Sequence, residues 1–227
     1  DNLSVQVHPD NDYALKNEGE YGKTEMWYIV DCDEGSSLIY GLNKEISKEE
    51  FSERIKNNTL LEVTNSVPVK KGDVFFIESG TLHAIGKGIV IAEIQQNSNT
   101  TYRVYDYGRI GVDGKPRPLH VEKAIDVTSL KPLPKQKSVV YENFDGYKKA
   151  CLSGCEYFNV YEYNITESAL FNADEKSFNS ILVIDGSGLL NYEDNNIEIN
   201  KGDSIFIPAG MGKYIISGNL SVILTDI

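Results

Sequence analysis

The chain has 227 residues, enough for one large or two modest domains, and its 22 basic and 34 acidic side chains give a net charge of −12. Nucleic acid and anionic membranes repel a strongly negative surface, so we expect neither as a partner. No apolar run approaches the roughly 20 residues that span a bilayer. The three cysteines have neither zinc-ribbon nor thioredoxin spacing, which favours a reduced, cytoplasmic setting.

Short strands and one helical insertion are predicted for the first half of the chain. Alternating apolar and polar residues predict a strand that ends at Pro9. Ser47 and Glu50 form a capping box, in which the serine holds an early helix amide and the glutamate reaches back. With Phe51 and Ile55 as its apolar stripe, this box predicts a helix near 47–60. Further strands are predicted over 26–30, 38–40, 67–69, 74–77, 83–85 and 89–94.

Loops and then more strands are predicted for the second half. Residues 97–119 are rich in glycine, proline and asparagine, residues 120–127 predict a short helix, and a linker with two prolines follows. We expect hairpin turns at 186–188 and 194–196. Many short strands with regular turns are typical of antiparallel sandwiches and barrels. The strands are predicted over 158–163, 180–184, 188–192, 197–199, 204–207, 214–216 and 220–224.

A repeated phrase organises the whole chain. The stretch 71–83 begins Lys-Gly-Asp and continues as strand and turn, and the stretch 201–213 repeats this pattern. Internal repetition predicts related domains in tandem. We expect a metal-binding domain over 1–130, a linker and first strand region over 131–155, and a second domain over 156–227. The first copy ends in His83, a candidate metal ligand, and the second in Lys213, which is not one.

The spacing inside this phrase resembles the second motif of the cupin superfamily. In the first copy Glu78 stands where proline is usual, whereas the second copy has Pro208 in that place and Lys213 at the histidine position. The resemblance implies an all-β fold of two tandem cupin-type jelly-roll β-barrels, with a short helical insertion in the first. It also implies that the second barrel has a degenerate metal site.

Four residues of the first domain form a candidate metal site. Gln6 and His8 are two apart on a predicted strand and share a face, and Glu25 opens the next long strand. With His83 they supply two oxygens and two nitrogens, a set compatible with one Zn2+. A single strand histidine is more often a core or surface residue than a ligand, and Glu25 alone could be a solvated strand end. Two of the three histidines fall at these points, which favours the metal site.

Four segments in a fixed order resemble type I mannose-6-phosphate isomerase in its short bacterial form. They are Leu3–Pro9, Gly22–Tyr28, Gly80–Ala84 and Asn97–Arg103. The resemblance implies a zinc-dependent enzyme that interconverts mannose 6-phosphate and fructose 6-phosphate by enediol-type proton transfer. The family's N-terminal segment has no counterpart here, and Ile85 stands where tyrosine is often found. We therefore expect a part of a longer polypeptide, whose own activity stays open.

The resemblance also assigns roles to individual residues. The family's metal ligands fall on Gln6, His8, Glu25 and His83. Its active-site arginine, glutamate and lysine fall on Arg103, Glu93 and Lys23, and its phosphate-contacting serine on Ser4. Lys23 and Arg103 would contact both the reacting oxygens and the phosphate.

The proposed chemistry needs a base and positive charge near the sugar. Proton transfer between C1 and C2 of a sugar passes through an enediolate, whose charge Arg103 and Lys23 can neutralise. Glu93 is one candidate base and a water on the metal is the other. Arg103 alone could be a surface loop cation. Only the resemblance to the family's motifs supports functional roles for Lys23 and Ser4.

Two other functions are compatible with parts of the sequence. A non-catalytic cupin could use the same pocket for sugar binding or regulation. An iron or manganese oxygenase is disfavoured, because such cupins usually present more histidines than a site with Gln6 allows. The expected partner is a small-molecule sugar phosphate, and a homodimer is left open. We expect His120 to be structural and the acidic turn at 31–34 to be solvated.

Overall fold

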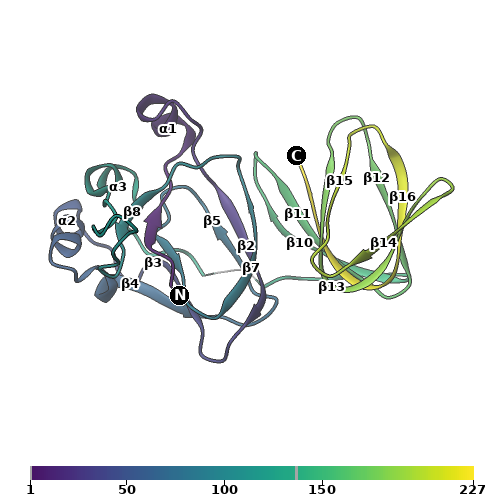
Figure 1. Cartoon of the computed structure of the whole chain (residues 1–227), viewed down its shortest axis with the longest axis horizontal. Helices are drawn as coiled ribbons and strands as arrows, with labels where there is room; N and C mark the ends of the chain where they lie inside the picture. The colour runs from purple at the N-terminus through teal and green to yellow at the C-terminus, as the bar shows by residue number, and fades with distance from the viewer. Residues whose placement is uncertain (1, 136–137) are drawn as a thin grey trace. The chain divides into compact units, whose positions relative to one another are not determined.

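The computed structural model describes residues 2–135 and 138–227, and the chain divides into two compact units, 1–136 and 137–227. Figure 1 shows strands dominating both units and the labelled helices confined to the first. None of the described helices has the length and apolar character that a membrane span requires.

The first unit contains two antiparallel sheets. One sheet has five strands in the order β4-β3-β6-β1-β8, and the other has three in the order β5-β2-β7. The strands of both sheets are β1 (Val5–Val7), β2 (Glu25–Cys32), β3 (Ser37–Leu42), β4 (Thr64–Pro68), β5 (Val74–Ile77), β6 (His83–Ile85), β7 (Ile89–Gln95) and β8 (Tyr102–Tyr105). The predicted strands of this half are therefore present.

Helices account for the remaining elements of the first unit. They are α1 (Asn11–Asn17), α2 (Lys48–Lys56), the 3-10 helix η1 (Leu60–Val63) and α3 (Val121–Val127). Ser47 Oγ accepts a hydrogen bond from Glu50 N at 3.1 Å, so the predicted N-cap of α2 is confirmed. The prediction that Glu50 reaches back to the start of the helix is wrong, because the Glu50 carboxylate pairs with Lys44 and Arg54 instead. The predicted helix also divides in two, since Asn58 adopts a positive φ of 57°.

The five-stranded sheet has an apolar face and a face that carries the candidate site. Val5 and Val7 of β1 pack with Phe51 of α2 in one buried cluster, to which η1 and α3 also contribute. Successive strand residues point to opposite faces, so Gln6 faces the other way. On that side, Ile85 of β6 packs with Trp27 of β2 in a second buried cluster. The space between the two sheets of this unit therefore holds both apolar core and candidate ligands.

The two copies of the repeated phrase form the same turn. Gly72 and Gly202 have φ angles of 89° and 97°, which L-residues with side chains rarely adopt. Each glycine donates its N–H to a strand carbonyl at 2.8 Å. The aspartate that follows, Asp73 or Asp203, accepts a hydrogen bond from the N–H three residues before it. The repetition in sequence thus corresponds to repetition in structure.

The second unit is built from strands alone in its described residues. Its sheet has the order β14-β13-β16-β11-β10-β9, with β12 paired to β16 and β15 to β13. The strands are β9 (Glu142–Phe144), β10 (Tyr147–Gly154), β11 (Asn159–Ile165), β12 (Ser168–Ala173), β13 (Asn179–Tyr192), β14 (Asn195–Asn200), β15 (Ser204–Ile207) and β16 (Gly212–Asp226). β9 and β10 lie within the segment 131–155, where a linker and first strand were expected.

Two turn predictions for this unit need correction. Residues 186–188 lie inside the continuous strand β13 and make no hairpin turn. A Cβ added at Gly218 of β16 would lie 2.7 Å from the Gly188 Cα, so these glycines allow two strands to approach closely instead of reversing the chain. The reversal between β13 and β14 falls at 193–194, where Glu193 has a φ of 51°, slightly before the predicted 194–196.

Candidate active site

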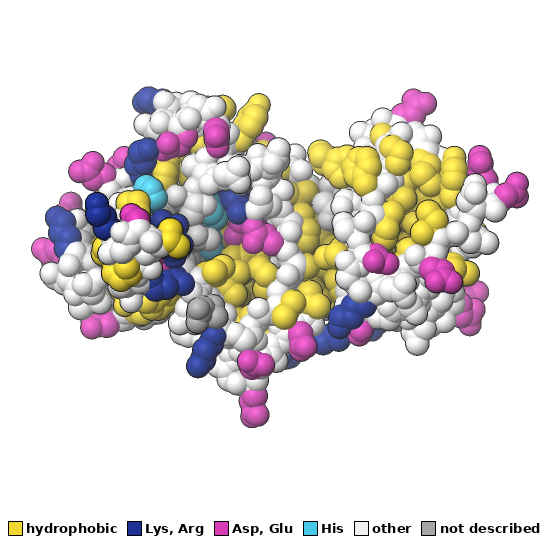
Figure 2. Space-filling model, in the orientation of Figure 1, with side chains coloured by type: hydrophobic (Ala, Val, Ile, Leu, Met, Phe, Trp, Pro, Cys, Tyr) yellow, Lys and Arg dark blue, Asp and Glu magenta, His cyan; other side chains and the backbone are white. Residues whose placement is uncertain are grey.

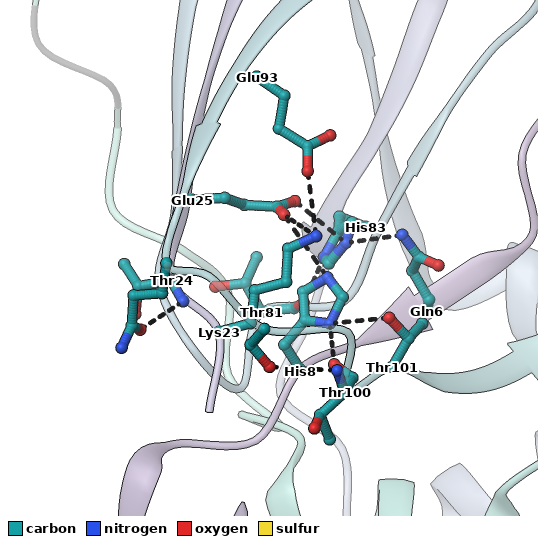
Figure 3. A network of polar contacts seen from close by, with 12 residues as sticks. Gln6, His8, Lys23, Thr24, Glu25, Thr81, His83, Glu93, Thr100 and Thr101 are labelled. Carbon is teal, nitrogen blue, oxygen red and sulfur yellow. Dashed lines mark hydrogen bonds and ion pairs between the residues drawn. The ribbon is translucent and has the colours of Figure 1, made fainter. Parts of the chain in front are cut away.

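The three strongest candidate ligands converge at the ends of three strands. His8 follows β1, Glu25 opens β2 and His83 opens β6, and each is at most 1% exposed. Their ligand atoms all lie within 4.8 Å of one another (Figure 3). His8 Nε2 is 3.7 Å from Glu25 Oε2, and His83 Nε2 is 3.5 Å from Glu25 Oε1. Residues far apart in sequence therefore form one compact polar group.

Main-chain carbonyls set the tautomer of both histidines. His8 Nδ1 donates to the Thr100 carbonyl and His83 Nδ1 to the Thr81 carbonyl, each at 2.8 Å. Because Nδ1 carries the proton, the Nε2 lone pair of each ring points toward Glu25. Burial lowers the pKa of His8 well below its usual value and lowers the pKa of His83 to about 4. Both rings are therefore neutral at neutral pH, the state that binds a metal.

Gln6 completes the predicted set. It is paired with His83 in the register of β1 and β6, and its Nε2 lies 3.3 Å from His83 Nε2. A half turn of the carboxamide would present the oxygen at the same place, which is the atom a cation requires. The structure thus brings Gln6, His8, Glu25 and His83 together.

The local chemistry fits a divalent cation. His8 Nε2 and both carboxylate oxygens of Glu25 are buried without a hydrogen-bond partner in the described residues. Lys23 Nζ forms an ion pair with Glu25 Oε2 at 2.9 Å, so one cation already lies beside this group. Buried acceptors without donors are costly, and a metal ion would satisfy all three at once. Imidazole and carboxylate ligands suit zinc among other divalent metals.

Lys23 connects the His8–Glu25–His83 group, called the metal-type group from here on, to Glu93. The lysine Nζ donates to Glu93 Oε1 at 3.0 Å, and the Glu93 side chain is 32% exposed. Burial opposes the charge of Lys23, but Glu25 and Glu93 outweigh this effect and raise its pKa. Burial and the nearby Glu93 carboxylate raise the pKa of Glu25 to about 7, against the opposing effect of Lys23. A buried cation and an accessible carboxylate therefore lie directly beside the metal-type group (Figure 3).

Arg103 lies in strand β8, opposite Gln6 of β1. Directly opposed residues of antiparallel strands share a face of the sheet, so both side chains project to the same side. The Arg103 Nε donates to Ser4 Oγ at 3.3 Å. His120 fixes the backbone of Arg103 with two hydrogen bonds. The His120 ring Nδ1 accepts from Arg103 N, and the main-chain N–H of His120 donates to Arg103 O. Arg103 is thus an ordered strand residue, and the structural role predicted for His120 is confirmed.

Several residues that position the site could not be recognised from the sequence patterns. Thr81 and Thr100 act through their main-chain carbonyls, which leave no residue-type signature. Gln96 accepts a hydrogen bond from Thr24 N at 2.8 Å and donates its own N–H to Thr24 O, which fixes the chain just before Glu25. The only available signal for Gln96 was its position two residues beyond the strand predicted over 89–94.

Lys213 occupies the second unit's counterpart of the His83 position. It lies exposed on β16, in register with Asn172 of β12. A protonated lysine offers no lone pair to a metal. The one metal-type group found among the described residues is the His8–Glu25–His83 group of the first unit. A metal-free second unit remains a prediction.

The chain is similar to known mannose-6-phosphate isomerases along nearly its whole length. The family model "Mannose-6-phosphate isomerase, cupin domain" matches residues 148–227. Mannose-6-phosphate isomerase ManA of Bacillus subtilis is 41% identical over 226 residues, covering 99% of this chain and 71% of that relative. Mannose-6-phosphate isomerase of Streptococcus mutans is 40% identical, with coverages of 97% and 69%.

Solved structures agree with these relatives. The crystal structure of the mannose 6-phosphate isomerase from Bacillus subtilis has a TM-score of 0.93 at 40% identity, covering 100% of this chain and 72% of that one. A structure from Archaeoglobus fulgidus has a TM-score of 0.77 at 19% identity, covers 99% of this chain and 67% of that one, and shares the fold. The predicted cupin fold, nearly all β with short helices in the first unit, is therefore confirmed.

The fold and the buried His-Glu-His group define a cupin protein with a candidate metal centre in its first unit. The relatives make the assignment more specific. The chain belongs to the mannose-6-phosphate isomerase family, whose named members are aldose–ketose isomerases.

Glu25→Gln is expected to stabilise the metal-free protein while preventing metal binding. A glutamine amide can donate to His8 Nε2 and removes the cost of burying a carboxylate whose pKa burial raises to about 7, while Lys23 keeps its hydrogen bond to Glu93. In the presence of a chelator we expect a gain of about 1–3 kcal/mol in the free energy of unfolding, measured by denaturant titration. Glu78→Gln, at an exposed carboxylate, is the control. Equal destabilisation by Glu25→Gln with and without metal would contradict the metal-site interpretation.

Proposed function

We propose that this chain carries the zinc site and catalytic residues of an isomerase that interconverts mannose 6-phosphate and fructose 6-phosphate. The observation that carries the proposal is the convergence of buried acceptors without donors, His8 Nε2 and the Glu25 carboxylate, directly beside Lys23 and Glu93. Membership of the mannose-6-phosphate isomerase family supports the choice of substrate.

Gln6, His8, Glu25 and His83 would hold the zinc ion, which would supply Lewis-acid polarisation of the sugar's oxygen atoms. The remaining steps fall to the chain's own side chains. Glu93 takes the proton from C2 of mannose 6-phosphate and returns it to C1, while the O2 hydroxyl proton moves to O1. The carbonyl thereby moves from C1 to C2. The net change is a shift of two hydrogens, and no co-reactant is required.

Positive charge beside the base stabilises the enediolate. Lys23 lies 3.0 Å from Glu93, close enough to orient that carboxylate and to bind a developing oxyanion. Arg103 projects from the neighbouring sheet on the face that carries Gln6. Ser4, which accepts from Arg103, would contact the substrate phosphate. These assignments give each predicted site residue a defined task.

The experiment is turnover combined with metal analysis. Zinc-loaded protein, both as this chain and as any longer parent, is incubated with mannose 6-phosphate in D2O. We expect fructose 6-phosphate with partial solvent deuterium at C1, from exchange of the Glu93 carboxyl proton with solvent before it is returned, and one zinc per chain by elemental analysis. One bound metal without turnover in either form would favour the alternative, a non-catalytic sugar-binding cupin. Activity that requires iron and oxygen would favour the oxygenase. The cytoplasmic setting remains a prediction.

A further inference from the structure

The second unit has its own counterpart of the Glu25 position. Glu25 opens β2 and pairs with Ile77, the seventh residue of the first copy of the repeated phrase. Asn179 opens β13 and pairs with Ile207, the seventh residue of the second copy. Asn179 is 6% exposed, so this position is buried in both units. The second unit therefore carries a neutral amide where the first carries a candidate metal-binding carboxylate.

The partner of this amide also differs from the histidine of the first unit. Lys213 stands at the His83 place of the phrase but is exposed, whereas the next residue, Tyr214, is 2% exposed. Asn179 Nδ2 donates to Tyr214 Oη at 2.8 Å. This hydrogen bond uses the amide nitrogen, so the amide oxygen can accept from a ligand. The pair lacks the imidazole and carboxylate groups of the first unit, which favours an organic occupant over a metal ion.

A cavity of about 210 Å³ lies beside Asn179 in the second unit. Its walls include the aromatic rings of Tyr161, Tyr163 and Phe171. The Tyr163 and Phe171 rings meet edge to face, with their centroids 4.8 Å apart. Sites for drug-sized ligands measure roughly 300–1,000 Å³, so this cavity suits a smaller molecule.

Two opposite charges accompany the aromatic walls. Lys149 Nζ lies 4.2 Å from the ring centroid of Tyr161 and 5.3 Å from that of Tyr163. This cation–π contact leaves the ammonium N–H groups able to donate to a ligand. Asp226 Oδ1 accepts from Asn159 Nδ2 at 2.9 Å, and its second oxygen can accept from a ligand. The cavity lining therefore offers both donors and acceptors and has no net charge.

The side chains on the visible face differ between the two units. Figure 2 shows Lys and Arg gathered on the first unit, whereas hydrophobic side chains cover much of the second and Asp and Glu lie at its margin. An anion such as phosphate requires several cations, and this cavity is lined by a single one, Lys149. Aromatic faces with a few polar groups of both kinds suit a ring that has apolar C–H faces and hydroxyl edges.

We propose that this cavity of the second unit binds an uncharged pyranose sugar. A C–H face of the sugar would lie against Tyr161, and its hydroxyls would bind Asn179, Asp226 and Lys149. This ligand differs from the sugar phosphates of the proposed function, because the cavity has no second cation for a phosphate group. The inference therefore goes beyond the proposed function and does not depend on it.

The first test locates binding on the whole chain by NMR titration. The probe is methyl α-D-mannopyranoside, whose locked ring cannot open to the carbonyl form that isomerisation requires, so turnover does not interfere. We expect saturable shifts of the Asn179 side-chain amide signals. Cyclohexanol and inorganic phosphate are the comparison probes. Equal affinity for cyclohexanol would show a merely apolar cavity, and binding of phosphate in place of the glycoside would show an anion site. Either result would overturn the proposal.

The second test uses two neighbouring lysines of β10 as a matched pair. Lys149→Gln removes the cation of the cavity. Lys148→Gln makes the same charge change at an exposed residue whose Nζ lies over Tyr141 instead. A hydrogen bond from a charged donor corresponds to about tenfold or more in affinity. We expect glycoside affinity to fall about tenfold for Lys149→Gln and to stay at the wild-type value for Lys148→Gln. Equal affinities in the two variants would exclude Lys149 from the site.

A third test addresses the aromatic wall. Tyr161→Phe keeps the ring and should bind the glycoside nearly as wild type does, whereas Tyr161→Ala should lose about tenfold in affinity. Melting temperature shows whether each variant is folded. If Tyr161→Ala does not fold, the two lysine variants still decide the question. Unchanged affinity in a folded Tyr161→Ala, or no glycoside binding by the wild-type chain, would show that the rings only form a hydrophobic core and would reject the sugar site.

Discussion

Replacing His83 with alanine is expected to remove the metal and reduce isomerisation below detection, while the fold is retained. The side chain is fully buried, and its Nε2 is directed at Glu25 by the Thr81 carbonyl. Loss of one of four ligands removes most of the metal affinity. The surrounding sheets depend on apolar residues such as Trp27 and Phe75, so circular dichroism should be unchanged. His8→Ala is expected to give the same result.

The matched control is Lys213→Ala, at the same position of the repeated phrase in the second unit. Lys213 is exposed, and we expect full metal content and full turnover in this variant. Elemental analysis and turnover are measured on the same samples. Full metal occupancy in His83→Ala, or two metals per wild-type chain, would reject the single-site interpretation.

Arg103→Lys is expected to lower kcat by a factor of about 10²–10³, with a smaller effect on KM. Removal of one donor that acts on a developing oxyanion costs about 2.7–4 kcal/mol. The guanidinium is held by Ser4 Oγ and the Pro118 carbonyl, and a lysine ammonium cannot reproduce both contacts and still present a planar fork. Steady-state kinetics with mannose 6-phosphate give both constants.

Arg54→Lys serves as the control for this substitution. Arg54 is a helix residue that pairs with Glu50 and Glu62 away from the site, and exposed ion pairs contribute about 0–1 kcal/mol. Its kinetic constants should equal those of wild type. A rise in KM alone for Arg103→Lys would limit the role of Arg103 to contact with the substrate phosphate. Wild-type values for both constants would remove Arg103 from the site.

Features that depend on neighbouring residues could be predicted from the sequence. The Lys-Gly-Asp phrase predicted two related β units, because Gly72 and Gly202 each supply a left-handed turn that few other residues tolerate. Ser47 predicted the start of α2 through a hydrogen bond to a residue three positions away. The two-residue strand period separated Gln6 from its apolar neighbours, and the family motifs then supplied the ligand set and its assigned roles.

Strand continuity and the close contacts of the site were decided by the tertiary structure. The glycines of β13 resembled a turn in sequence, and only the approach of β16 shows that they lie inside a strand. The contacts of Lys23 with Glu93 and of Asp106 with Arg117 join separate elements. The histidine tautomers depend on carbonyls that any residue could provide. Turns and strand periods are properties of adjacent residues, whereas these contacts exist only once distant strands have packed together.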